Sequence, residues 1–261
     1  MKSSRLRLIS QIVFFTISSA ILAFVIIAGK KAIHNICPYA IVCFGLSGGA
    51  ILNFVLSSFI VGIVLGLVFL ILSMWWGRFF CGWICPLGTL QEALFAFRNR
   101  KYRCKHKVSY FYENKFSKAK YLILIITIIL VITGASYVYI QYCPFFVLSQ
   151  LPHLALGGLL FLIGIMVLGL FVERFWCRYL CPYAALLNIF EALGKLIGIP
   201  RTKIHRNLER CVDCGVCMLY CPMNIDLSQD EKVESPNCIM CLLCTEKCPK
   251  SGTLDCQKDK S

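Results

Sequence analysis

"CVDCGVCMLYCP" (residues 211–222) and "CIMCLLCTEKCP" (residues 238–249) decide how the last part of this chain folds. Both follow the spacing C-x-x-C-x-x-C-x-x-x-C-P without deviation. Three cysteines spaced in this way can bind three irons of one 4Fe–4S cluster, and the fourth, followed by proline, ligates the other cluster. The spacing therefore predicts two 4Fe–4S clusters in a bacterial-type two-cluster ferredoxin domain. The expected ligands are Cys211, Cys214, Cys217 and Cys248 for the first cluster, and Cys238, Cys241, Cys244 and Cys221 for the second.

Zinc is the alternative for these eight cysteines, because thiolates also bind zinc tetrahedrally. Zinc sites pair two C-x-x-C motifs, however, and give no reason for the doubled pattern seen here. A disulfide framework would need an oxidising compartment, whereas the charge distribution described below places this part of the chain in the cytoplasm. Iron–sulfur ligation is therefore the favoured interpretation.

The chain upstream of Arg201 is unusually apolar. Of the whole sequence, 58% is hydrophobic and the mean hydropathy is +0.73, compared with about 45–50% apolar residues in soluble domains. A helix needs about 20 mostly apolar residues to cross a membrane. Four segments meet this requirement, near Leu8–Ala28, Ile51–Trp75, Tyr121–Ile140 and Leu156–Val172. We expect four transmembrane helices, the first of them a retained anchor because its apolar stretch exceeds the roughly 7–15 residues of a signal peptide.

The distribution of positive charge predicts the orientation. The segment Arg98–Lys120 contains nine Lys and Arg residues and one acid, Glu113, whereas the loop between the third and fourth helices has no charge. Because positively charged loops stay in the cytoplasm, this segment and both termini are expected there. Lys30 and Lys31 lie on the opposite side in this scheme. The net charge of +14 comes mostly from residues that flank the membrane, so no nucleic-acid partner is expected.

A tandem repeat organises the membrane region. "GRFFCGWICPLGTLQEALF" (77–95) and "ERFWCRYLCPYAALLNIFE" (173–191) align at an offset of 96, and Cys37-Pro38 and Cys143-Pro144 each precede the second helix of a repeat. Each unit is therefore a helix, a Cys-Pro turn, a second helix, a C-x-x-x-C-P motif and an amphipathic helix. Parallel repeats of this kind are related by an axis along the membrane normal. The expected domains are membrane repeats at 1–106 and 107–200, followed by the ferredoxin domain at 201–261.

The C-x-x-x-C-P motifs contribute two pairs of cysteines, Cys81 with Cys85 and Cys177 with Cys181. Cysteines at i and i+4 share one face of a helix. Two pairs brought together by the pseudo-symmetry would supply four thiolates for a further iron–sulfur cluster, another metal or a redox-active dithiol. Small residues at a close helix–helix contact are the structural alternative, and the sequence leaves both interpretations open.

The motifs "RFFCGWICPLGTLQ" (78–91) and "RFWCRYLCPYAALL" (174–187), joined to a two-cluster ferredoxin tail, resemble the NapH-type 4Fe–4S ferredoxin membrane proteins. The resemblance covers nearly the whole chain. It implies a quinol dehydrogenase component of the kind that feeds periplasmic nitrate reductase, with NosR-type and CcoG/RdxA-type proteins as relatives. It also implies that the eight tail cysteines hold two 4Fe–4S clusters. Because the relatives serve different substrates, the resemblance indicates the reaction type and leaves the partner open.

Other cofactors have no motif in this sequence. A membrane haem b needs paired histidines within the spans, but the four histidines lie outside the spans or at their ends. No flavin-attachment motif, C-x-x-C-H haem motif, G-x-G-x-x-G or phosphate-binding loop occurs. We therefore expect neither haem nor flavin, and no nicotinamide chemistry.

Together these patterns predict an α-helical, multi-pass protein of the prokaryotic cytoplasmic (inner) membrane. It would pass electrons between the quinone pool or a partner redox protein and its two clusters, as part of the electron supply of a reductase. Its partners would be membrane lipid, quinone or quinol, and that redox protein. The alternatives are a CcoG-type metal-handling factor that reduces copper for oxidase maturation, and a passive anchor for a reductase. The sequence decides neither the direction of electron flow nor whether the chain is itself an enzyme.

Overall fold

The computed structural model describes residues 2–27, 60–97, 107–149, 156–227 and 231–258 of the 261 residues. The predicted Cys37-Pro38 turn, Lys30 and Lys31, the first section of the second apolar segment and most of the basic cluster at 98–106 lie outside these ranges. The described chain is mostly helical, as predicted.

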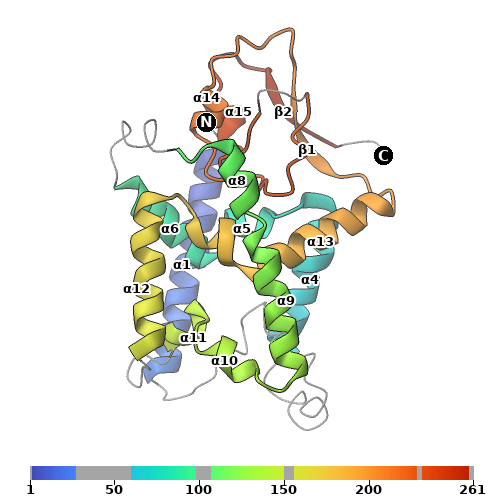
Figure 1. Ribbon diagram of the computed structural model, residues 1–261. Helices are drawn as coiled ribbons and strands as arrows, with labels where there is room; N and C mark the ends of the chain where they lie inside the picture. Colours follow the sequence, from blue (N-terminus) through green and yellow to red (C-terminus); the bar gives the residue numbers. More distant parts are fainter. Residues whose placement is uncertain (1, 28–59, 98–106, 150–155, 228–230, 259–261) are drawn as a thin grey trace.

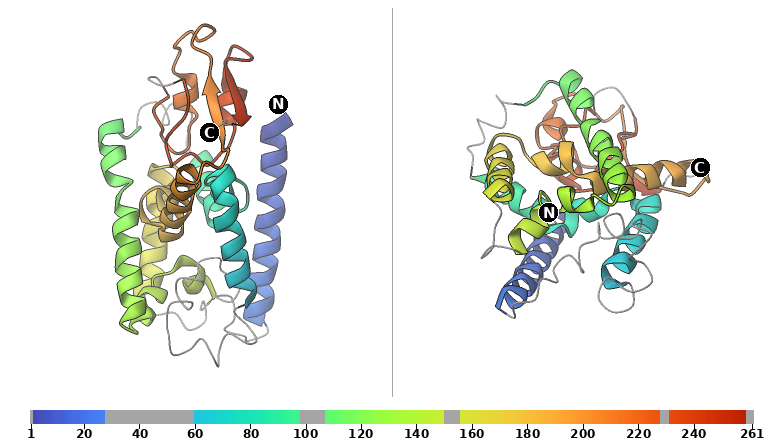
Figure 2. Two further views of the ribbon diagram at one scale, coloured as in Figure 1. Left: turned by 90° about the vertical axis from the view of Figure 1, so that its right-hand side faces the viewer. Right: turned by 60° about the horizontal axis from the view of Figure 1, so that its bottom comes forward.

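Four long apolar helices extend away from the ferredoxin end of the molecule in roughly the same direction (Figures 1 and 2). They are α1 (Lys2–Ile27), α4 (Ile60–Trp76), α9 (Ala119–Ile132) and α12 (Leu156–Phe171). Each overlaps one of the four predicted segments, and α1 begins six residues before the first of them. The third segment is not one continuous helix, however, because α9 ends at Ile132 and Gly134 has a φ of 78°. Glycine adopts this left-handed conformation without steric cost, and the chain continues as the short helix α10 (Ser136–Ile140).

Among the described residues, one helix is long and apolar enough to cross a membrane by itself. It is the stretch of α1 from Ser4 to Phe24, 21 residues with a mean hydropathy of 1.8. Shorter apolar helices cover Gly62–Trp76 and Leu156–Phe171. The four-span topology therefore stays a prediction.

Apolar side chains on all four long helices are exposed at the surface of the protein. Phe24 of α1 and Ile132 of α9 are each 69% exposed, and Leu160 of α12 is 60% exposed. Soluble monomers rarely expose large apolar patches, so such side chains indicate a surface covered by lipid or by another protein.

Each C-x-x-x-C-P motif starts a helix in the same way. Cys85 and Cys181 have extended backbones, with φ/ψ of −63°/113° and −70°/112°, and the following prolines begin α6 (Pro86–Ala96) and α13 (Pro182–Leu196). Proline suits the first position of a helix because its missing N–H would be unpaired there. The segments before the cysteines differ between the repeats, since α5 (Phe79–Trp83) corresponds to a π-helix, η3 (Trp176–Leu180).

The two repeats exchange packing partners. Helix α13 of the second repeat packs against α4 of the first repeat, and α6 of the first packs against α12 of the second. Helix α8 (Tyr110–Phe116) leads into α9, and α11 (Pro144–Ser149) follows α10 at the far end. The exchange joins the helices of the two repeats into a single interlocked unit.

The ferredoxin region is a small α+β unit at one end of the helices (Figure 2). Strand β1 (Thr202–Arg206) pairs antiparallel with β2 (Leu254–Lys258), with Ile204 opposite Cys256. Two short helices, α14 (Val216–Leu219) and α15 (Leu243–Lys247), follow the central cysteines of the two runs. The hydrophobic core of this unit continues into the membrane region, because Ile204 and Ile239 belong to the same buried cluster as Leu187 of α13. The domain limits at 106 and 200 stay predictions.

Candidate iron–sulfur sites

Two cavities in the ferredoxin region separate its eight cysteines into two sets. The first cavity, of about 300 Å³, is lined by Cys211, Cys214, Cys217 and Cys248. The second is tighter, about 30 Å³, and is lined by Cys221, Cys238, Cys241 and Cys244. These are the two sets that the spacing predicts, each with three cysteines from one run and the last cysteine of the other. Ligation of iron by these sets stays a prediction.

The two cysteine loops share an unusual backbone. Asp213 and Gly215 in the first run have φ values of 47° and 68°, and Met240 and Leu242, 27 positions later, have 49° and 58°. Alternation of right- and left-handed residues turns successive N–H groups towards one point, a concavity that binds anions and occurs at many iron–sulfur sites. Non-glycine residues rarely adopt positive φ, so its repetition in both loops fits two anionic clusters.

The chemistry of the donor sets also fits a cluster. Among the residues the structure describes, no three His, Cys, Asp or Glu side chains lie close enough together to hold one metal ion. A 4Fe–4S cluster gives each cysteine an iron of its own, so its ligands surround a cavity. Burial raises the pKa of Cys238 to about 11 and that of Cys241 to about 12. These groups therefore stay thiols until a metal displaces the proton.

Arg206 distinguishes the first cavity from the second. From β1, its Nε and Nη2 atoms lie 3.2 and 3.1 Å from Cys211 Sγ, and it also forms an ion pair with Asp213. Hydrogen bonds to cysteine sulfur and solvent exposure set the reduction potential of a cluster. The first set contains an exposed cysteine, Cys214, whereas Cys241 of the second set is buried.

The loop of the second set contacts the membrane repeats directly. Trp83 Nε1 donates a hydrogen bond of 3.0 Å to the carbonyl of Met240, and Arg78 Nη1 donates one of 3.2 Å to Asn237 Oδ1. Gly82 of α5 lies against this loop so closely that a Cβ atom would collide with the carbonyl oxygen of Ile239. The second cavity is therefore adjacent to the first C-x-x-x-C-P motif.

A reciprocal pair of arginines joins the two C-x-x-x-C-P motifs. Arg78 Nη2 donates a 2.6 Å hydrogen bond to the carbonyl of Cys177, and Arg174 Nη1 donates to the carbonyl of Cys81. Both arginines are 0% exposed. Each repeat thus supplies the cation that holds the cysteine segment of the other repeat.

This exchange brings the two cysteine pairs together. A hydrogen bond with the Cys85 thiol, followed by burial, raises the pKa of Cys177 well above its usual value. Burial, then the proximity of Cys177 and Cys81, raises the pKa of Cys181. The four thiols therefore lie close together beside the ferredoxin region, with Cys81 and Cys177 buried and Cys85 and Cys181 half-buried.

Comparison with known families matches both regions of this arrangement. A family model described as "4Fe-4S binding domain" matches twice, at residues 58–105 and 154–200, once over each C-x-x-x-C-P motif. A "4Fe-4S dicluster domain" model matches residues 203–249, which contain all eight tail cysteines. No solved structure matches the chain.

Curated proteins match over most of the chain. The protein MJ0750 of Methanocaldococcus jannaschii is 32% identical over 207 residues, 78% of this chain and 83% of its own length. YccM of Escherichia coli (strain K12) is 30% identical over 71% of this chain, which spans 53% of YccM. NapH of the same bacterium, named a ferredoxin-type protein, is 25% identical over 66% of this chain and 59% of its own length. This chain belongs to the NapH/NosR-type family of 4Fe–4S ferredoxin-like proteins.

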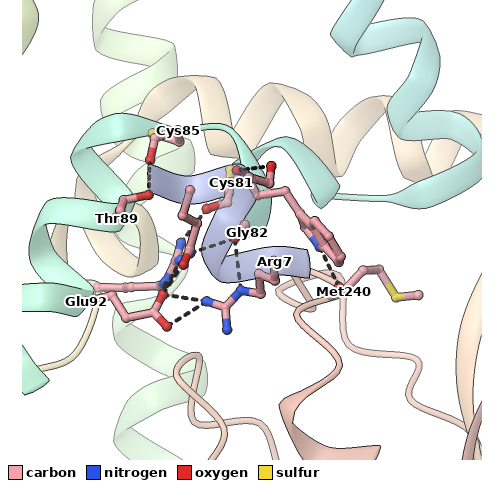
Figure 3. A network of polar contacts seen from close by, with 11 residues as sticks. Arg7, Cys81, Gly82, Cys85, Thr89, Glu92 and Met240 are labelled. Carbon is pink, nitrogen blue, oxygen red and sulfur yellow. Dashed lines mark hydrogen bonds and ion pairs between the residues drawn. The ribbon is translucent and has the colours of Figure 1, made fainter. Parts of the chain in front are cut away.

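In this NapH/NosR-type protein, α1 is fixed to both repeats by a shared carboxylate (Figure 3). Arg7 Nη2 lies 2.7 Å from Glu92 Oε1, and Arg174 Nε lies 3.1 Å from Glu92 Oε2. Arg7 and Gln11 also donate to the carbonyl of Gly82, at 3.1 and 3.0 Å. Partial burial alone would raise the pKa of Glu92, but the charges of Arg174 and Arg7 outweigh it and lower the pKa to about 2.

Several residues of this region were not identified from the sequence. They are Arg7, Glu92, Lys120 and Asn237. The alignment of the two repeats does contain one signal. The position equivalent to Glu92 is Asn188, so Arg174 has a carboxylate partner and the equivalent position gives Arg78 none.

Glu92 is expected to be essential for stability. Replacing Glu92 with Gln leaves Arg174 buried without a carboxylate, which should cost about 3–5 kcal/mol of unfolding free energy. The matched control is Glu234→Gln, where the acid is exposed and its ion pairs should be worth about 1 kcal/mol or less. Thermal or denaturant unfolding in detergent measures both changes.

The same carboxylate predicts a pH dependence. Because its pKa is lowered from 4.5 to about 2, its contribution is complete above pH 4.5 and is lost as the pH falls towards 2. The wild type should lose this share of its stability over that interval, and Glu92→Gln should not. Parallel acid curves for the two proteins would contradict the assignment.

Gly82 tests the contact between the ferredoxin loop and the membrane region. In Gly82→Ala the new methyl group meets a backbone carbonyl, which has no rotamer to change, so overpacking should cost about 1–3 kcal/mol. Gly164→Ala on α12 is the control, because nothing lies within 4 Å of a Cβ atom there. Equal stabilities of the two variants, measured by thermal unfolding, would show that the loop does not dock on α5.

Proposed function

We propose that this protein is a membrane-bound electron-transfer protein that carries two 4Fe–4S clusters on the cytoplasmic side. It would pass electrons between the quinone pool, or a partner redox protein, and a reductase-associated system. The observation that carries the proposal is the pair of cavities, each lined by one complete set of four cysteines. When bound, 4Fe–4S clusters supply one-electron transfer.

The position of the second cavity supports a route between membrane and solvent. Its loop docks on α5 through Gly82 and Trp83, whereas the first cavity includes exposed Cys214. Electrons would therefore enter or leave the membrane region through the second cluster and exchange with a soluble partner through the first. The Arg206 hydrogen bonds to Cys211 and the greater exposure of the first set should give that cluster the higher reduction potential.

The apolar surfaces of the long helices support the membrane assignment, with four spans as the proposed topology. Ser4 donates to Glu246 at 3.0 Å from its backbone and 2.8 Å from its hydroxyl, so the N-terminal end of α1 lies at the ferredoxin end. Lys107, from the basic segment, donates to the carbonyl of Met218 at the same end. Because basic segments stay in the cytoplasm, we place this end and both termini there, on a prokaryotic inner membrane.

The quinone link and the reductase partner rest on similarity to the NapH and NosR proteins. Because the chain covers about a quarter of the length of NosR and 59% of NapH, the partner is proposed only as a class. The three domains expected from the sequence, 1–106, 107–200 and 201–261, are proposed as the two repeats and the ferredoxin.

Iron and sulfide analysis tests the two tail clusters. Replacing one cysteine of each cavity, Cys217 and Cys244, with alanine should remove about eight irons and eight acid-labile sulfides per chain from anaerobically purified protein. Cys256→Ala is the control, because this exposed cysteine of β2 lines neither cavity. Stoichiometric zinc without sulfide in the wild type would overturn the assignment.

Reporter fusions test the orientation. A reporter placed after Ser261, or near Arg103 in the basic segment, should report a cytoplasmic location. A reporter near Ser149 should report an external one. An external Ser261 fusion would place the clusters in an oxidising compartment and rule out the proposed route.

A further inference from the structure

We propose that Cys81, Cys85, Cys177 and Cys181 form one cofactor site shared by the two repeats, and that this site binds a third 4Fe–4S cluster. The site goes beyond the two tail clusters of the proposed function. The role of this site as an electron carrier rests on the proposed function. Its existence is inferred from the geometry and charge of the two repeats.

The geometry requires both repeats. Each match of the 4Fe–4S binding model contains only one C-x-x-x-C-P motif, and two cysteines cannot complete the four ligands of a cluster. The arginine exchange supplies the other two, because it fixes the segment of Cys81 beside that of Cys177. Cys81 is 4% exposed and Cys177 is 2% exposed, whereas Cys85 and Cys181 are half-buried.

The charge around these thiols indicates a missing anion. Arg174 has the carboxylate of Glu92 as a partner, but the equivalent position for Arg78 is the neutral Asn188. Arg78 donates to two neutral oxygens, Cys177 O and Asn237 Oδ1, and forms a hydrogen bond with the Cys81 side chain, while its Nε atom has no hydrogen-bond partner among the described residues.

A guanidinium is always charged, and a buried charge without a counter-charge is strongly unfavourable. Lys120, 1% exposed, donates to the same Asn237 oxygen. An anion at the four sulfurs would balance the charge of Arg78.

A cluster supplies that anion. On ligation each thiol releases its proton to solvent and its sulfur bonds to one iron of a preformed cluster, with no change of oxidation state. Four thiolates carry more negative charge than the iron–sulfide core carries positive charge, so the product is an anion. Two disulfides, by contrast, would be neutral and would leave Arg78 unbalanced.

The position fits an electron carrier. Arg78 touches both the Cys177 carbonyl and Asn237, the residue next to Cys238 of the second set. Gly82, between Cys81 and Cys85, lies directly against the second-cluster loop. The shared site therefore lies between the helix bundle and the second cluster.

Metal analysis of the full chain tests the proposal. Anaerobically purified wild type should contain about twelve irons and twelve sulfides, four for each cluster. The double variant Cys85→Ala/Cys181→Ala should contain about eight, with the tail clusters still reducible by dithionite. Cys143→Ala, which removes another buried cysteine of the membrane region, should match the wild type.

About eight irons in both the wild type and the double variant would overturn the third cluster, and so would zinc or disulfides at these four cysteines. The wild-type count decides this even if the double variant does not fold. Failure of the two tail clusters would give a different result. Cys217→Ala/Cys244→Ala would then remove no iron relative to the wild type, whereas Cys85→Ala/Cys181→Ala would still remove about four.

Arg78 provides an independent test. If it balances the anion, Arg78→Met should lose about four irons per chain, or shift the potential of the remaining third cluster downwards, and Arg78→Lys should recover the iron. If the cysteines only pack, Arg78→Met should change the melting temperature without changing the iron content. This second result would overturn the proposal.

Discussion

The membrane region depends on one reciprocal interaction, in which two fully buried arginines each hold the backbone of the opposite repeat. Arg78 donates to Cys177 O and Arg174 to Cys81 O. Burying a guanidinium is costly unless its donors and its charge are satisfied, so neither repeat can place its arginine without the other. Helix α6 packs against the second repeat and α13 against the first, so the packing of these helices also requires both repeats. A single repeat would leave its one buried arginine unsatisfied and two helix faces unpaired.

The repeats are similar in plan but not identical in chemistry. Glu92 of the first repeat is equivalent to the neutral Asn188 of the second, and the short helix α5 corresponds to the π-helix η3. Inserted π-turns occur mostly at functional positions in helices. The Arg-Phe and Cys-Pro residues that shape the backbone are the same in both copies. The backbone is therefore arranged similarly in the two repeats, whereas their charged residues differ.

The sequence predicted what is encoded by short spacing. The predicted ligand sets and the helices that begin at Pro86 and Pro182 both follow from short motifs. The residues within each motif are close to one another along the chain. The break after Ile132 was missed because a single glycine, Gly134, interrupts an otherwise continuous apolar run. Glu92 and Asn237 were missed for a different reason. Their partners Arg174 and Arg78 are 82 and 159 residues away, and such pairings leave no periodic pattern.

The bond between Ser4 and Glu246 spans 242 positions of the chain. Ribosomes synthesise a protein from its N-terminus, so early segments can fold before later ones have been made. The first helix is thus among the first segments made, yet its N-terminal end has its partner in the last cysteine loop. Closure of this contact must be one of the final events of biogenesis. A chain whose last cysteine loop has not folded would therefore leave Ser4 without this partner, while Arg7 and Gln11 still hold α1 to the first repeat.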